Sequence, residues 1–374
     1  PTWILTAKHC VTGGGLSFRI GSLDQHSGGV VANGVQTYTH SSDLALVRTD
    51  GRWVIDTADS RSQVRPICKA KDDCVAADPA IAPLVAQAHE AALAYVNTPI
   101  GNSTVHLSSY FADEGNSTAL AVVNAAQRAY VQAELPAMHP ELAKVPVLSA
   151  AAPFRTGFGG PDDYTDVPAG ALTLRSAADL YFYPNTLAAV KTDGAGVKAW
   201  LEKSAERYNT LDPRKPGEQA LINTRYVGYN VDQIQGGLKY VIDLARPAGA
   251  RIVSLTFNGK PVDPKQPFIV ATNNYRANGG GNFPGLDGKS VVLAAPDGTR
   301  EILADWLRAK GRLTAKDLEP TPWRFAPLKL AGPVTFDCAA GKIDVARAAG
   351  VANVRQLRDN GDGTASCAIE LPSR

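Results

Sequence analysis

The stretch FIVATNNYRANGGGNFP, residues 268–284, joins an apolar run to a polar, glycine-rich turn. The apolar residues Phe268–Ala271 predict a buried strand, and the turn after them predicts a loop open to a ligand. Tyr275 offers a flat π face, successive glycines allow close approach to the backbone, and asparagines supply paired donors and acceptors for a planar heterocycle. An ordinary Gly/Asn turn with an exposed tyrosine is the alternative. The candidate contacts are Asn274, Tyr275, Gly279, Gly280 and Gly281.

A second aromatic cluster has the same layout. The run DLYFYPNT, residues 179–186, places Tyr183 two positions before Asn185. Two aromatic rings can sandwich one purine or pyrimidine base. Because Tyr183 and Tyr275 are far apart in the sequence, a joint site requires the fold to bring two loops together.

Both segments resemble the C-terminal domain of the secreted 5′-nucleotidase family. Within that family, the chain is most similar to the bacterial 2′,3′-cyclic-nucleotide 2′-phosphodiesterase/3′-nucleotidase branch. The resemblance extends from about Gly51 to the end of the chain. It also rests on the runs Asn97–Gly101, Ser149–Arg155, Tyr164–Gly170 and Leu255–Pro261.

The resemblance implies roles for individual residues. Tyr183 and Tyr275 match the two aromatics that stack on the nucleobase, and Asn185 matches an amide at the base edge. Arg155 matches an arginine near the phosphate, although a surface ion pair is the alternative. Gly281 stands where 5′-nucleotidases carry an Asp, which leaves the ribose contact open and fits the cyclic-nucleotide branch.

The first fifty residues resemble a different family. WILTAKHC, residues 3–10, precedes DLALVR, residues 43–48, as in trypsin-like serine proteases. The resemblance implies that His9 is the general base and Asp43 its orienting partner. That family takes its nucleophile and oxyanion hole from a Gly-Asp-Ser-Gly-Gly run, which this sequence does not contain. We therefore expect an inactive remnant and a chimeric chain, with the change near Arg48–Trp53.

Nucleotidases of the first family are two-domain enzymes, and the resemblance implies a pair of divalent metals in the N-terminal domain. The family's ligand motifs are Asp-x-His, Gly-Asn-His-Glu and Gly-His-x-His. Only Asp24–His26 matches one of them, without its partner motifs, and we interpret it as chance. The sequence thus predicts no metal and no cofactor in this chain, with two divalent metals in a catalytic domain that is missing from it.

Composition indicates a folded, multidomain protein. Hydrophobic residues make up 44% of the 374 residues and charged residues 20%, which is enough for a sizeable core. The net charge is +2 and no Lys/Arg run stands out, so we expect a nucleotide or nucleoside partner and neither a nucleic-acid polymer nor a membrane. No apolar run approaches the roughly 20 residues of a membrane span. The chain opens without a basic-then-apolar leader, and we place any signal peptide outside it.

Five cysteines suggest two bridges and one orphan. Cys68 and Cys74 could close a short loop, Cys338 and Cys367 bracket the C-terminal segment, and Cys10 is left over. These spacings favour a secreted, periplasmic or cell-surface protein, with five free thiols in a reducing compartment as the alternative.

The element pattern predicts an α+β fold. We expect a helix from Asp78–Pro79 with one buried stripe, a helix from Ser117 to Leu135 stopped by Pro136, and helices near 197–208 and 301–309. We expect Val334–Phe336 and Ala368–Leu371 to be edge strands of a small β element. The predicted domains are a protease fragment (1–50), a remnant of the metal domain with a linker helix (51–97), the nucleotide-binding domain (98–325) and the β element (326–374).

The functional prediction is nucleotide recognition by a domain of a secreted nucleotide phosphohydrolase separated from its metal domain. Such a chain binds nucleosides and nucleotides weakly and hydrolyses almost nothing. The alternatives are a trypsin-like serine endopeptidase with an accessory domain and a fusion without selected activity.

Overall fold

The computed structural model describes residues 3–6, 17–20, 30–39, 45–49 and 79–372, in two units, Pro1–Leu84 and Val85–Arg374. In the first unit, four antiparallel strands form a sheet in the order β1-β4-β3-β2. Their bounds are β1 (Trp3–Thr6), β2 (Ser17–Ile20), β3 (Val30–Thr39) and β4 (Ala45–Thr49). The predicted dyad of His9 and Asp43, the match at Asp24–His26, and Cys10, Cys68 and Cys74 lie outside the described residues.

Helix α1 (Ile81–Val96) confirms the predicted helix but not its buried stripe. None of its side chains is buried, and Leu84 is 83% exposed. The stripe prediction was wrong because the apolar side chains of α1 find no packing surface in the described part of the chain.

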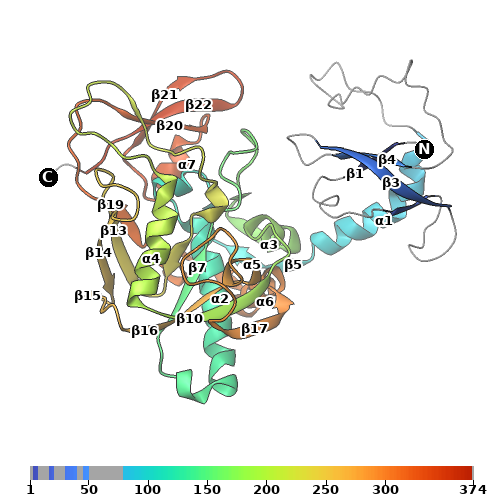
Figure 1. Cartoon of the computed structure of the whole chain (residues 1–374), viewed down its shortest axis with the longest axis horizontal. Helices are drawn as coiled ribbons and strands as arrows, with labels where there is room; N and C mark the ends of the chain where they lie inside the picture. Colours follow the sequence, from blue (N-terminus) through green and yellow to red (C-terminus); the bar gives the residue numbers. More distant parts are fainter. Residues whose placement is uncertain (1–2, 7–16, 21–29, 40–44, 50–78, 373–374) are drawn as a thin grey trace. The chain divides into compact units, whose positions relative to one another are not determined.

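A five-stranded sheet lies at the centre of the second unit, in the order β12-β7-β16-β10-β17 (Figure 1). Strands β7 and β16 are parallel, and the other neighbours are antiparallel. Their bounds are β7 (Val147–Ala151), β10 (Thr186–Asp193), β12 (Gln233–Gln235), β16 (Pro267–Asn273) and β17 (Val291–Gly298).

Both faces of this sheet are buried, which explains the continuous apolar run in β16. Phe268 and Val270 pack in one core cluster with Trp200 of α4 (Gly194–Ser204). Ile269 and Ala271 pack in another, with side chains from α2 (Thr118–Met138) and α6 (Thr299–Lys310). Side chains alternate across a strand, so a strand buried on both faces needs apolar residues at every position.

Helix α2 differs from the prediction at its end. It continues through Pro136 to Met138, where Pro136 was expected to stop it. A proline in the last turn removes only one N–H, and the helix still closes with a bond from His139 N to Leu135 O of 2.8 Å.

Smaller elements surround the central sheet. One sheet runs β15-β14-β13-β19, another β18-β5-β9, and β6 pairs with β8. These strands are β5 (Pro99–Ser103), β6 (Leu107–Ser108), β8 (Asp166–Val167), β9 (Gly170–Thr173), β13 (Leu238–Ile242), β14 (Ile252–Phe257), β15 (Lys260–Pro261), β18 (Arg312–Leu313) and β19 (Trp323–Phe325). The short helices α3 (Leu174–Leu180) and α5 (Asn274–Ala277) flank β10 and β16.

The C-terminal segment supplies α7 (Ile343–Ala348) and three strands of a four-stranded sheet in the order β11-β20-β22-β21, and β11 comes from earlier in the chain. Its strands are β11 (Gln219–Ala220), β20 (Val334–Ala339), β21 (Val354–Asp359) and β22 (Thr364–Ile369). The predicted Cys338–Cys367 disulfide is confirmed. The edge-strand prediction was wrong: β20 and β22 lie at the centre of the sheet, because β11 adds to one side and β21 to the other.

The mixed α+β class is confirmed. No helix in the described ranges is long and apolar enough to cross a membrane.

Candidate functional site

The central sheet brings the two predicted aromatic loops to the same end. Strands β10 and β16 are antiparallel, with Leu187 opposite Asn273. The loop before β10 and helix α5 after β16 are therefore neighbours. The Asn274 side-chain oxygen accepts a hydrogen bond of 3.2 Å from the backbone N–H of Thr186, which ties the two loops together. The fold thus supplies the assembly that the sequence required.

Tyr183 is held by other aromatic rings. Its ring meets Phe154 edge to face at 5.1 Å and Phe182 at 5.3 Å between centroids. Phe154 also packs against Tyr181 at 5.0 Å. Tyr183 remains 40% exposed, so its ring is fixed in direction and still accessible to a ligand.

Tyr275 rests on the glycine run. A Cβ added at Gly280 would lie 2.4 Å from Cε1 of the Tyr275 ring, closer than real contacts allow. The Tyr275 ring therefore occupies the space in which a side chain at position 280 would lie. Gly279 and Gly281 have φ of 99° and 79°, a conformation that glycine adopts readily. Tyr275 is 51% exposed.

A buried ion pair supports the backbone of the loop that follows β16. The Arg276 Nε lies 2.8 Å from Asp232 Oδ2, and both side chains are almost fully buried. Arg276 also donates to the backbone oxygens of Gly280 (2.5 Å) and Tyr229 (3.1 Å). Its guanidinium lies 4.0 Å from the Phe283 ring centroid. Arg276 thus fastens the backbone on which Tyr275 rests.

Asn185 lies half-buried beside a second tyrosine. The side chains of Asn185, Asn273 and Thr299 lie around the hydroxyl of Tyr181, which has no well-formed hydrogen bond in the described chain. Burial raises the pKa of Tyr181, and these side chains oppose the increase. The backbone oxygen of Asn185 accepts a bond of 2.8 Å from Thr299 N, which fixes the loop to the start of α6.

Arg155 is engaged with the protein itself. Its Nε lies 3.3 Å from Asp163 Oδ1, and its Nη2 donates to the Asp162 backbone oxygen at 2.8 Å. The structure therefore contains the ion pair that was the alternative interpretation of this residue. The side chain is about a quarter exposed, so a phosphate contact would have to share the guanidinium with Asp163.

Sequence reasoning missed the supporting residues. Arg276 and Phe154 were both inside the motifs that carry the resemblance, yet neither received a role. Arg276 directly follows Tyr275 and Phe154 directly precedes Arg155, and these positions could have drawn attention to both residues. Nothing in the sequence indicated that Asp232 pairs with Arg276, because the two are far apart in the chain.

The described residues do not fit a two-metal centre. No three His, Cys, Asp or Glu side chains among them gather in a group that could hold a metal ion. Paired divalent cations need such a cluster.

The fold agrees with the comparisons. The sequence model of the family described as 5′-nucleotidase, C-terminal domain, matches residues 99–288. The chain belongs to this family. The trypsin family model matches residues 1–104.

Curated relatives extend this assignment. The 2′,3′-cyclic-nucleotide 2′-phosphodiesterase/3′-nucleotidase of Haemophilus influenzae is 40% identical over 306 residues, covering 76% of this chain and 46% of the relative. The protein of the same name from Salmonella typhimurium is 41% identical over 306 residues, with the same coverage of both chains. The chain thus spans about half the length of these curated relatives.

Solved structures share the fold. A protein described as a 5′-nucleotidase from Staphylococcus aureus, in complex with alpha-ketoglutarate, has a TM-score of 0.51 at 18% identity, covering 79% of this chain and 50% of that one. A 5′-nucleotidase precursor from Thermus thermophilus has a TM-score of 0.50 at 17% identity, covering 79% and 49%. At these identities the likeness shows the fold alone.

Proposed function

We propose that residues 98–325 bind a nucleoside or nucleotide with its base between Tyr183 and Tyr275. The observation that carries the proposal is the tie between the two loops, from Thr186 N to Asn274 Oδ1, beside two exposed and independently supported tyrosine rings. Stacking needs aromatic faces that are open to solvent before binding and held in direction by the protein.

The polar residues of the site would contact different parts of the nucleotide. Asn185, two residues after Tyr183, contacts the base edge through its amide. Arg155 contributes positive charge on the phosphate side, shared with Asp163. Gly280 acts indirectly, because its lack of a side chain leaves room for the Tyr275 ring.

The relatives' names give the reaction class. We propose that the domain serves hydrolysis of 2′,3′-cyclic nucleotides and 3′-nucleotides by supplying base recognition to a protein with a separate metal-binding catalytic domain. In this scheme residues 1–50 are a protease-like fragment, 51–97 a remnant with the linker helix, and 326–374 a β element. The Cys338–Cys367 bridge supports an exported protein.

A calorimetric titration with adenosine and 3′-AMP tests this function. The unmutated chain should bind both ligands. Tyr183→Ala and Tyr275→Ala should each lose about 1 to 3 kcal/mol of binding free energy, and the double variant should show no saturable binding. Tyr95→Ala, which removes an exposed tyrosine from α1, is the matched control and should bind like the unmutated chain. Equal affinity in the double variant, or no binding by the unmutated chain, would sink the proposal.

A further inference from the structure

A cavity lies between the core of the nucleotidase domain and the C-terminal sheet. It has a volume of about 280 Å³. One wall comes from residues 109–114, another from the loop 156–164, and a third from β20 and Thr364. None of Tyr183, Asn185 and Tyr275 lines it. The cavity is therefore a different site from the base-binding loops.

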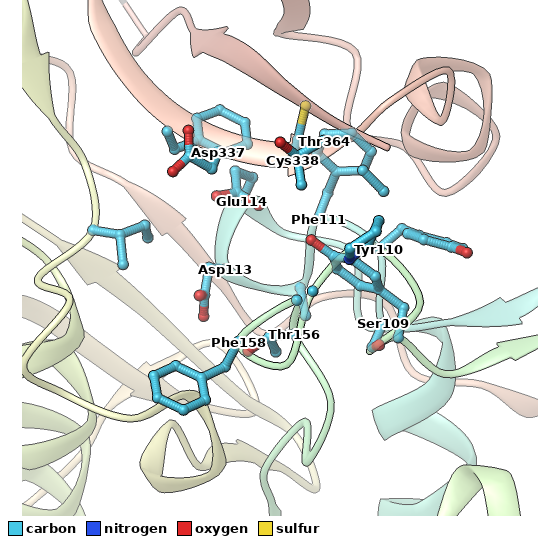
Figure 2. Close-up of a pocket in the computed structure, with 18 of the residues that line it drawn as sticks. Ser109, Tyr110, Phe111, Asp113, Glu114, Thr156, Phe158, Asp337, Cys338 and Thr364 are labelled. Carbon is cyan, nitrogen blue, oxygen red and sulfur yellow. The ribbon is translucent and has the colours of Figure 1, made fainter. Parts of the chain in front are cut away.

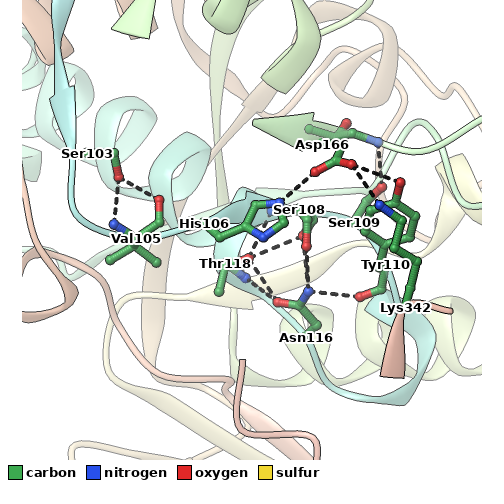
Figure 3. Close-up of polar contacts among 11 residues, drawn as sticks. Ser103, Val105, His106, Ser108, Ser109, Tyr110, Asn116, Thr118, Asp166 and Lys342 are labelled. Carbon is green, nitrogen blue, oxygen red and sulfur yellow. Dashed lines mark hydrogen bonds and ion pairs between the residues drawn. The ribbon is translucent and has the colours of Figure 1, made fainter. Parts of the chain in front are cut away.

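Polar contacts hold the two sides of this cavity together (Figure 3). Asp166 of β8 accepts a hydrogen bond of 3.0 Å from the Tyr110 hydroxyl and lies 3.2 Å from Lys342 Nζ, just before α7. His106 Nε2 lies 2.6 Å from the other oxygen of Asp166. Burial opposes ionisation of Asp166, but its hydrogen bonds with His106, Tyr110 and Lys342 outweigh burial and lower its pKa. The C-terminal wall is thus anchored to the core.

Inside the cavity, an ion pair leaves one carboxylate oxygen without a partner. Asp113 Oδ2 lies 2.7 Å from Arg207 Nη2, and both side chains are buried. Arg207 is further occupied by the backbone oxygen of Tyr226 at 2.6 Å. The other oxygen, Asp113 Oδ1, is buried and has no hydrogen-bond partner among the described residues. A buried acceptor left without a donor is costly.

Glu114 adds a second carboxyl to the same cavity. It is only 9% exposed, and its carboxyl makes no hydrogen bond or ion pair with any other residue in the described chain. Asp113 and Glu114 both line the cavity, and in Figure 2 Glu114 lies above Asp113. Burial, reinforced by the negative charge of Asp113, raises the pKa of Glu114 well above its usual value. Only Asp113 is paired with the Arg207 guanidinium, and the Glu114 carboxyl lies next to this pair without a partner among the described residues.

Aromatic side chains also line the cavity. Tyr110 stacks on Tyr164 with ring centroids 4.6 Å apart, and Phe111 meets Phe336 edge to face at 6.2 Å. Phe158, on the loop between two glycines, is 83% exposed. Aromatic faces beside carboxylates attract a cation that also carries apolar surface.

We propose that this cavity binds a small organic cation, a primary ammonium group on an apolar body, with the ammonium between Asp113 and Glu114. An ammonium supplies three N–H donors, which fits the buried, unpartnered Asp113 oxygen and the Glu114 carboxyl. The paired acidic groups repel an anionic ligand. A metal ion is a poorer fit, because no group of three metal-ligating side chains occurs in the described residues. The apolar body of the ligand packs against Phe158 and Tyr164.

A matched pair of probes tests the charge requirement. Benzylammonium and the neutral benzyl alcohol have nearly the same shape, and each is titrated calorimetrically into the full chain. Benzylammonium should bind saturably and at least about tenfold more tightly than benzyl alcohol, because hydrogen bonds to a charged group are the stronger ones. Equal binding of the two probes, or no saturable binding of benzylammonium, would overturn the proposal.

Single substitutions test whether benzylammonium binds in this cavity. Glu114→Gln keeps the size of the side chain and should weaken benzylammonium at least about tenfold, while Glu218→Gln, at an exposed position, should leave it unchanged. Phe158→Ala, at an exposed aromatic, should also weaken binding without unfolding the chain. Adenosine titration of each variant reports separately on the base site, so failure of one site is distinguishable from failure of the other. Unchanged benzylammonium affinity in both Glu114→Gln and Phe158→Ala would place the cation elsewhere.

Discussion

Two buried arginine–aspartate pairs lie in the same domain and differ in how completely they are satisfied. In the pair of Arg276 and Asp232, the guanidinium meets the carboxylate and two backbone oxygens, and Asp232 also accepts a bond of 2.7 Å from Trp200 Nε1. In the pair of Arg207 and Asp113, one carboxylate oxygen has no partner in the described chain. Glu114 is next to Asp113 in the chain, and its carboxyl has no partner among the residues that the structure describes.

The difference teaches how a buried charge relates to binding. A fully satisfied pair has no capacity left for a ligand, and it serves to position the surface ring of Tyr275. An incompletely satisfied pair retains acceptors that a ligand can use. Mutations should therefore affect the two regions in different ways.

Removing Asp232 should have the largest effect. Asp232→Ala leaves the buried Arg276 without its counter-charge, and we expect a loss of about 3 to 5 kcal/mol in the free energy of unfolding, measured by urea denaturation. Asp344→Ala, which breaks an exposed pair with Arg347, should cost at most about 1 kcal/mol. Similar losses in the two variants would contradict the structural role of the Asp232 pair.

Removing the disulfide should affect the cavity side alone. Cys338 lines the cavity, and its bridge to Cys367 spans 29 residues. The double variant Cys338→Ser/Cys367→Ser should lose about 2 to 4 kcal/mol of stability in thermal unfolding, because the unfolded chain is less constrained. Adenosine affinity at a temperature where the variant is folded should not change. A large loss of adenosine affinity there would show that the two regions are coupled.

Adding one methyl group under Tyr275 should act on binding. Gly280→Ala places a Cβ against the ring, which must move, and we expect adenosine binding to weaken by about 1 to 3 kcal/mol in calorimetry. Gly217→Ala is the control, since a Cβ there meets nothing within 4 Å. Unchanged adenosine affinity in Gly280→Ala would mean that the position of the Tyr275 ring is not required.

Neutralising Glu114 should give the smallest effect, and a stabilising one. Because the folded-state pKa of Glu114 is raised, mainly by burial and then by Asp113, the protonated form favours folding and this contribution is lost as pH rises through the folded-state pKa. Glu114→Gln should therefore raise the free energy of unfolding by about 1 kcal/mol at neutral pH and by less near pH 4. Urea denaturation of both proteins at the two pH values measures the difference. A stabilisation that grows toward acid pH would contradict the assigned environment.

Much of the fold followed from local patterns. The run at 268–271 predicted a strand, and apolar spacing predicted a helix from Asp78–Pro79, which is found as α1. The helix expected near 301–309 is found as α6. The bridge between Cys338 and Cys367 was also predictable from the sequence. The exposure of α1 and the central place of β20 were not, since both depend on which surfaces meet in space.

The residue types of the candidate base site could be recognised from the sequence, because aromatic rings beside asparagines and glycines form a local pattern. The three-dimensional arrangement was needed to show that β10 and β16 bring the two loops together, that the Tyr275 ring lies over Gly280, and that Asp113 and Glu114 line one cavity with Arg207. The pairing of β10 with β16 and of Asp113 with Arg207 joins residues far apart in the chain, and the place of the Tyr275 ring depends on the backbone conformation of its loop. Such contacts leave no periodicity or spacing that can be seen in the sequence.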